Sequence, residues 1–197
     1  MEPDQHFVLA SHVFFLLPCI YGLKRKEYDI SLLTFVLALA STLYHAFIIT
    51  GMDAGYLQYA DFFLTRFSIV YVIFRTGNFS EKTSKLLTIV NLIATVTTMY
   101  DRFDDLSLAY MIGCSILIVL FKYAIYKEWS QVLWGYMGTG FGTIAVGIVF
   151  FILGGIFPQY YNWFHGVWHA MAFVTIYLVL EATTEGRTIL MMIRGGV

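Results

Sequence analysis

Long runs of apolar residues, separated by short polar connections, occupy most of the chain. A helix of roughly 17–25 apolar residues crosses the hydrocarbon core of a bilayer, which is about 30 Å thick. The fourth run, "KLLTIVNLIATVTTM", is the shortest and the most polar. The pattern predicts an all-α membrane protein, a bundle of seven transmembrane helices, with spans at about residues 7–23, 30–50, 56–74, 85–99, 106–121, 132–157 and 165–180.

The seven runs are expected to belong to one domain. The connections between them are short, and no Pro/Ser-rich linker divides residues 1–197. No small-residue cleavage site precedes the basic "KRKE" stretch, so the first run is interpreted as a retained span and not as a signal peptide. The sequence therefore predicts a single seven-transmembrane domain over residues 1–197.

The composition agrees with a membrane protein and argues against several other classes. Hydrophobic residues make up 59% of the chain and charged residues 13%, whereas an ordinary soluble domain is about 25% charged. The formal net charge of -1 argues against nucleic-acid binding, which requires a basic surface. Both cysteines, Cys19 and Cys114, lie within apolar runs, which argues against the disulfide framework of a small secreted domain.

Basic residues concentrate in alternate connections and in the C-terminal segment, while the opposite connections are acidic, with Arg102 as their one basic residue. Positively charged loops remain on the cytosolic side of a membrane. The sequence thus predicts an outside N-terminus and a cytosolic C-terminus. The residues on the predicted cytosolic side are Lys24, Arg25, Lys26, Arg75, Lys82, Lys85, Lys122, Lys127, Arg187 and Arg194.

Five polar residues stand within the apolar runs near the predicted outer side. Ser41 and His45 are one helical turn apart in the second span, and His165 and His169 are one turn apart at the start of the seventh. Asp61 follows the start of the third span at a similar depth. Three helices are therefore expected to bring these five side chains to one level in the outer half of the bilayer.

Two interpretations of this constellation stay open on the residue types alone. Three neutral imidazoles suit a zinc ion, with Asp61 and Ser41 placed to orient its water or a ligand histidine. Alternatively, the same groups form a metal-free hydrogen-bond network that holds the three helices together. Ionisable groups inside a membrane mark functional sites by default, but buried polar groups also serve as interhelical contacts.

Other polar and small residues receive structural interpretations. Arg66 is expected to face the interior of the bundle or an aromatic ring, and not a substrate. His6 is expected to be solvated, and His12 to be a stray polar group inside the first span. Gly138 and Gly142 have the GxxxG spacing that permits close helix approach. Packing within the bundle is favoured for this pair over an oligomer interface.

The motifs resemble those of the CREST superfamily, which includes alkaline ceramidases, the adiponectin and progestin receptors, and the myomaker family. Within it, the chain is most similar to the myomaker family of myoblast fusion, through "LYHA", "YDRF", "IGCSILIVLFKY" and "HGVWHAMAFVTIYLVL". The resemblance implies a zinc cofactor with His45, His165 and His169 as ligands, and Ser41 and Asp61 close to the metal-bound water. Two features depart from it: Ser41 is a hydrolase-like residue, and no cysteine-rich lipidated tail follows Val197.

The resemblance implies two functions. In the favoured one, the chain is a multi-pass plasma-membrane protein that promotes myoblast fusion in muscle development. It would act on membrane lipids as a homo-oligomer, expected to be a dimer. A fusion partner protein could act with it, and zinc would stabilise its fold. The alternative is an intramembrane zinc-dependent lipid amide or ester hydrolase of the alkaline ceramidase type, with Asp61 as general base and Ser41 stabilising the oxyanion.

Overall fold

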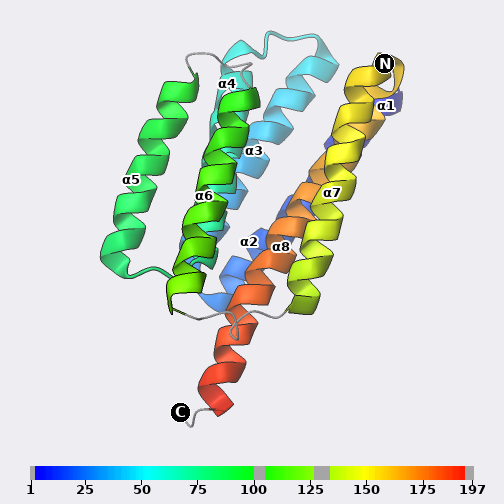
Figure 1. The fold of residues 1–197 in the computed structure, drawn as a ribbon. Coiled ribbons are helices and arrows are strands. Elements are labelled where there is room, and N and C mark those ends of the chain that lie inside the picture. The colour runs from blue at the N-terminus through cyan, green and yellow to red at the C-terminus, as the bar shows by residue number, and fades with distance from the viewer. Residues whose placement is uncertain (1–2, 100–104, 127–133, 194–197) are drawn as a thin grey trace. The chain divides into compact units, whose positions relative to one another are not determined.

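A computed structural model describes residues 3–99, 105–126 and 134–193, and every regular element in these ranges is helical (Figure 1). Each of the seven predicted runs contains a helix. Residues 100–103, the "YDRF" stretch, lie outside the described ranges. The elements are α1 (Pro3–Ser11), η1 (His12–Phe15), α2 (Leu16–Arg25), α3 (Tyr28–Thr50), α4 (Gly55–Thr76), α5 (Glu81–Thr98), α6 (Asp105–Tyr126), α7 (Trp134–Ile156), η4 (Pro158–Tyr160) and α8 (Tyr161–Ile193).

Within the described residues, five helical segments are long and apolar enough to cross a bilayer, as expected of a multi-pass membrane protein. They coincide with the predicted first, second, third, sixth and seventh spans. The apolar stretch in α6, Tyr110–Tyr126, is shorter, and α5 is not among the five. The fourth and fifth crossings, the single domain and the orientation of the termini therefore stay predictions. The five segments are His6–Arg25, Tyr28–Thr50, Gly55–Thr76, Trp134–Ile156 and Pro158–Thr183.

The distribution of side chains on α3 is the reverse of that on a soluble helix. Its buried face carries polar groups, including Thr34 and Ser41, both at most 1% exposed. Leu32, Phe35 and Leu39 lie on the opposite face and are at least half exposed. Apolar side chains in such a stripe would be unfavourable in water, but they are well solvated by lipid tails. The helix is therefore built to face a bilayer.

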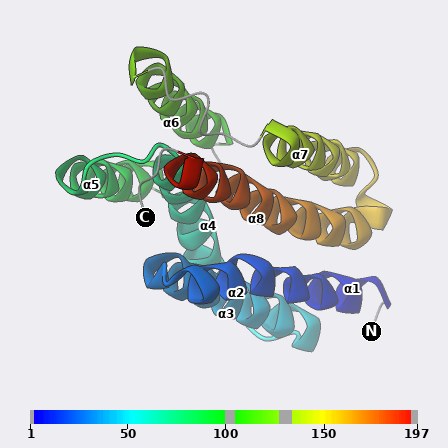
Figure 2. The ribbon, with the colours of Figure 1, turned by 90° about the horizontal axis from the view of Figure 1, so that it is seen from below.

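The contacts along the chain define two compact units, with boundaries inside α4 and α8. Unit 1 comprises Met1–Asp61 and Gly135–Val179, and unit 2 comprises Phe62–Trp134 and Leu180–Val197. In unit 1, α1 and α2 lie along α3, and α7 runs beside α8 (Figure 2). All five residues of the predicted site belong to unit 1.

Paired residues show in which direction the helices of unit 1 run. Between the first apolar segment, His6–Arg25, and α8, the residue numbers of the paired rings rise together, so these two segments run parallel. By contrast, Ser31 of α3 contacts Cys19, and Ser41, further along α3, contacts the earlier residue His12. The helix α3 therefore runs antiparallel to the first apolar segment. Parallel first and last spans are what five or seven alternating crossings require. The ascending ring pairs are Phe7–Trp163, Phe15–Phe173 and Tyr21–Tyr177.

Glycines on α7 allow it to approach α8 closely, but they are not the predicted pair. A Cβ at Gly147 would lie 2.9 Å from the Met171 Cβ, and one at Gly140 would lie 3.1 Å from Val179 Cγ2. At Gly138 and Gly142 a Cβ would meet no described atom within 4 Å. The GxxxG pair therefore does not pack against α8, because it lies on the opposite face of α7, and its packing within the bundle stays a prediction.

Unit 2 contains a buried polar network between α4, α5 and α6. Arg66 is 2% exposed and faces the interior, as predicted, and it also reaches the Ser107 hydroxyl at 3.4 Å. These direct hydrogen bonds connect three helices. The donors and their carbonyl acceptors are Arg66 to Thr98 (3.3 Å), Asn91 to Phe67 (2.9 Å) and Tyr123 to Thr76 (2.8 Å).

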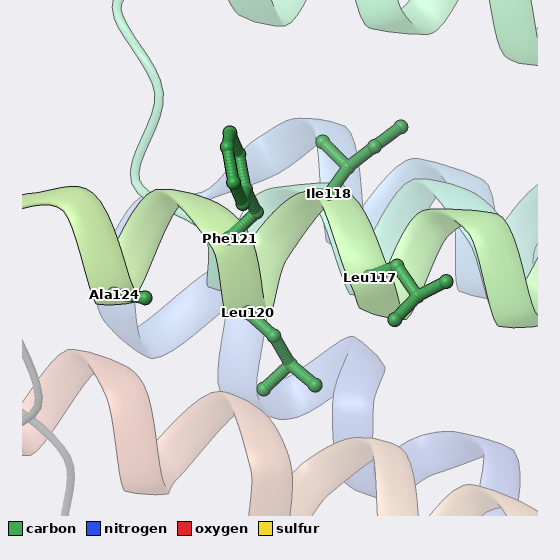
Figure 3. Close-up of a pocket in the computed structure, with 5 residues that line it drawn as sticks. All are labelled: Leu117, Ile118, Leu120, Phe121 and Ala124. Atoms are coloured by element: carbon green, nitrogen blue, oxygen red, sulfur yellow. The ribbon is translucent and has the colours of Figure 1, made fainter.

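The surface of α6 has an apolar hollow, and its lining comes from this helix alone (Figure 3). None of the lining side chains has a polar atom that could orient a substrate or hold an ion. The hollow fits contact with lipid chains and offers no chemistry. Its lining residues are Leu117, Ile118, Leu120, Phe121 and Ala124.

Candidate metal centre

A short 3-10 turn, His12–Phe15, interrupts the first apolar segment. Pro18 stands four residues after Phe14 and lacks the N–H that would bond to the Phe14 carbonyl in an α-helix. Its ring also crowds that carbonyl. A tightened turn just before the proline relieves both problems, which explains why the helix changes geometry at this point. The turn begins with a buried histidine, which contacts α3.

The ring of His12 is held at both nitrogens. Nδ1 lies 2.8 Å from the Val8 carbonyl oxygen and 3.1 Å from that of Leu9. Carbonyls only accept, so Nδ1 carries the proton, and in a neutral ring Nε2 then has the lone pair. Nε2 lies 3.0 Å from the Ser41 hydroxyl oxygen, which can donate to it. The backbone thus fixes the tautomer and directs a lone pair toward α3.

The other three histidines gather at the same place. His45 comes from α3, while His165 and His169 come from adjacent turns of α8. Their ring centroids are 5.4 Å apart for His45 and His165, 5.4 Å for His45 and His169, and 4.4 Å for His165 and His169. The structure thus brings together the histidines that the sequence pattern placed at one depth.

Each of these three rings has a buried nitrogen with no hydrogen-bond partner among the described residues: Nε2 of His45, Nδ1 of His165 and Nδ1 of His169. Leaving a buried polar atom unsatisfied costs about 1–3 kcal/mol. A complete metal-free network would have satisfied these atoms. Converging nitrogens without partners favour a bound cation, so the residues fit the zinc interpretation better than the network.

The set of close ligand atoms differs in part from the predicted set. Among the described residues, ligand atoms of His12, His45 and His169 all lie within 4.8 Å of one another, close enough to hold a metal ion. His165 is not in this close group, so the predicted ligand set of His45, His165 and His169 stays a prediction. The new observation is that His12, expected to be a stray polar group, belongs to the cluster.

Ser41 and Asp61 lie beside the histidines. Ser41 is 1% exposed, and its hydroxyl is hydrogen-bonded to the Asp61 carboxyl as well as to His12. This places a hydroxyl and a carboxyl from two helices next to the converging nitrogens. A group in this position can orient a histidine, stabilise an anion or accept a proton from water.

Two other residues considered from the sequence are not members of this cluster. Arg66 belongs to unit 2, where it is bonded to Thr98 and Ser107. His6 is exposed, as its position near the chain end suggested. The residue missed was His12, although a signal existed. The first and seventh predicted spans run the same way, and His12 stands five residues into the first, close to the depth of His169 in the seventh.

Comparison with known protein families gives a match over most of the chain. Residues 6–170 match the model of a family described as "Protein of unknown function (DUF3522)". No curated protein matches the chain. The matched region begins before His12 and ends just after His169, so it contains the whole candidate metal centre.

Proposed function

This chain belongs to the DUF3522 family of proteins of unknown function, and we propose that it acts at the plasma membrane to promote cell–cell fusion in the manner of the myomaker family. The supporting observation is that the motif residues behind the resemblance meet in one buried cluster of unit 1. A resemblance based on spacing gains weight when its residues also converge in space. These residues are Ser41, His45, Asp61, His165 and His169.

The proposed cofactor is zinc, held by His45, His165 and His169. When bound, zinc supplies a fixed junction between its ligands and a Lewis acid beside them. The chain brings buried ring nitrogens of α3 and α8, which have no hydrogen-bond partner among the described residues, into one cluster of unit 1. We propose that the junction fixes the placement of α3 against α8 and so stabilises unit 1.

The remaining surface supports an action on the bilayer itself. Exposed apolar side chains form the lipid-facing stripe of α3 and line the hollow on α6. Apart from the metal centre, no cluster of polar groups in the described residues suggests a head-group pocket. We therefore propose that the bundle remodels the outer leaflet without turning lipid over. It would act as a homodimer, and a fusion partner protein would complete the process.

A second candidate function is intramembrane hydrolysis of a lipid amide or ester, and the position of Ser41 favours it. Ser41 lies between His12 and Asp61, directly beside the histidine cluster. In this function Asp61 would accept the proton of the attacking water, and the Ser41 hydroxyl would donate a hydrogen bond to the developing oxyanion. Such proton transfer contributes typically about 10²–10⁴-fold to a rate.

Content mixing between cells tests the fusion proposal. Fibroblasts that express the chain would be mixed with fusion-competent muscle cells, each carrying one of two fluorescent cytosolic markers, with surface expression matched for every variant. We expect fusion with the wild type and with Ser41→Ala, and its loss in a His165→Ala/His169→Ala double variant. His6→Ala is the matched control for a histidine outside the cluster.

The three remaining outcomes separate the two functions. No fusion by the wild type at good surface expression would contradict the fusion proposal and favour the hydrolase. Loss of fusion in Ser41→Ala alone would show that fusion requires lipid chemistry. Fusion by the double histidine variant would show that the centre is not needed for this activity.

A further inference from the structure

We propose that His12 supplies a fourth imidazole to the metal centre, so that the centre is closed to water. This inference rests on the proposed zinc centre, to which it adds a ligand from the first apolar segment. Neither the spacing of the other three histidines nor the family resemblance assigns a role to this residue. The position of His12 in the structure assigns it this role.

The position of the His12 ring is that of a ligand and not of a bystander. Its centroid lies 5.3 Å from that of His45 and 4.9 Å from that of His169. These distances match those between the predicted ligands, which range from 4.4 to 5.4 Å. A ligand nitrogen of His12 also lies within 4.8 Å of those of His45 and His169. His12 thus belongs to the group of close ligand atoms, and His165 joins the cluster through its ring contact with His169.

The tautomer of His12 is already set for binding. Its Nδ1–H donates to the Val8 carbonyl at 2.8 Å, which leaves the lone pair on Nε2. Metal-ligating histidines characteristically donate their other N–H to a carbonyl or a carboxylate, which fixes the ring and makes the ligand nitrogen more basic. His12 has this arrangement on its own helix. Binding a metal would require no change of tautomer.

A metal centre with four protein ligands has a different function from one that keeps a position for water. Structural zinc sites have four protein ligands in a tetrahedron, whereas catalytic sites have three and keep a position for water or substrate. Four histidines from η1, α3 and α8 would join three segments of unit 1 through one ion. The centre would then stabilise the bundle and leave no position for a reacting water. Ser41 and Asp61 would support the ligands without performing catalysis.

The test replaces zinc with cobalt(II) in the purified full-length chain and follows its visible absorption during an azide titration. Azide binds an open position on cobalt and shifts the bands, whereas a closed set of four ligands gives it no site. We expect the wild-type spectrum not to change and the His12→Ala spectrum to shift. We also expect zinc to leave His12→Ala at least about tenfold faster in the presence of a chelator, in line with the 10–100-fold effects of supporting residues.

The wild-type titration decides the question even if His12→Ala fails to fold, because an azide-sensitive wild type contradicts a closed centre. An unchanging spectrum in both proteins would also contradict the proposal, since another group would then close the site. His6→Ala, an exposed histidine on the same segment, should behave as the wild type. A wild type that binds neither cobalt nor zinc would contradict the zinc centre itself. Azide sensitivity with tight metal binding would contradict only the role of His12.

Discussion

The two units bury polar groups inside apolar surroundings in opposite ways. In unit 2, Arg66, Asn91 and Tyr123 each donate to a backbone carbonyl. In unit 1, the converging rings of three histidines each retain a buried nitrogen with no partner among the described residues. The Ser68 hydroxyl of unit 2 also lacks a hydrogen-bond partner among the described residues, but it is not part of a cluster of histidines.

This difference distinguishes polar groups that join helices from polar groups whose arrangement is suited to binding a ligand. A donor that reaches a carbonyl of a neighbouring helix has completed its bonding, and its contribution is structural. Ring nitrogens that converge without partners are unfavourable until something binds them. The comparison leads to a central claim: the histidine cluster of unit 1 is a metal centre, and the network of unit 2 is structural.

The largest expected effect comes from the double variant His165→Ala/His169→Ala. Removing two ligands should abolish zinc binding and the stabilisation that comes with it, about 4 kcal/mol for a metal present at a thousand times its Kd. The measurement is the thermal unfolding midpoint of purified protein with and without a chelator. The wild-type midpoint should fall when chelator is added, and that of the variant should not. A variant that still responds to chelator would contradict the assignment.

The corresponding change in unit 2 is Arg66→Leu. It removes the charged hydrogen bonds to the Thr98 carbonyl and the Ser107 hydroxyl, and we expect a loss of about 1.5–3 kcal/mol of unfolding free energy. Zinc content, measured by mass spectrometry of the digested protein, should stay at the wild-type value. If Arg66→Leu lost zinc, the separation between a structural network and a metal centre would be wrong.

Two glycine substitutions on α7 test whether the close packing of α7 on α8 stabilises unit 1. Gly147→Ala would place a Cβ 2.9 Å from the Met171 Cβ, and such overpacking costs about 1–3 kcal/mol. Gly142→Ala on the same helix meets open space and should gain up to about 1 kcal/mol from helix propensity. Both stabilities can be measured by unfolding in detergent. Equal effects of the two substitutions would show that α7 does not pack on α8 as described.

The smallest effect is expected from Ser41→Ala. It removes the hydroxyl that bonds to His12 and Asp61, and a hydrogen bond of this kind contributes about 0.5–1.5 kcal/mol. Zinc content should be retained, because the ligand nitrogens remain. Zinc per chain and the unfolding midpoint, measured together, check this expectation. Complete loss of zinc in Ser41→Ala would show that the hydroxyl is essential to metal binding.

The sequence predicted the helices, and it predicted that the rings of His45, His165 and His169 come together. Apolar runs separated by charged turns define helices because a bilayer requires long, uninterrupted, internally bonded segments. The two turn-spaced pairs, Ser41 with His45 and His165 with His169, were enough to place four side chains at one depth. Helical spacing is a local property, so it can be read without knowledge of tertiary contacts.

Features that depend on which helix faces which do not follow from spacing along a single helix. His12 is brought to the cluster by a 3-10 turn before Pro18 and by the contact of that turn with α3. The glycines that face α8 are Gly140 and Gly147, and the motif pair Gly138 and Gly142 faces elsewhere. Spacing defines a face of a helix, but only the packing of the neighbouring helices decides which face is buried.

Measuring the metal content of the purified, wild-type full-length chain tests the central claim most directly. After dialysis against metal-free buffer, we predict about one zinc per chain, removed only by a strong chelator and with a fall in the unfolding midpoint. A folded chain that contains no metal, takes up none when zinc is added, and unfolds at the same temperature with and without chelator would contradict the account.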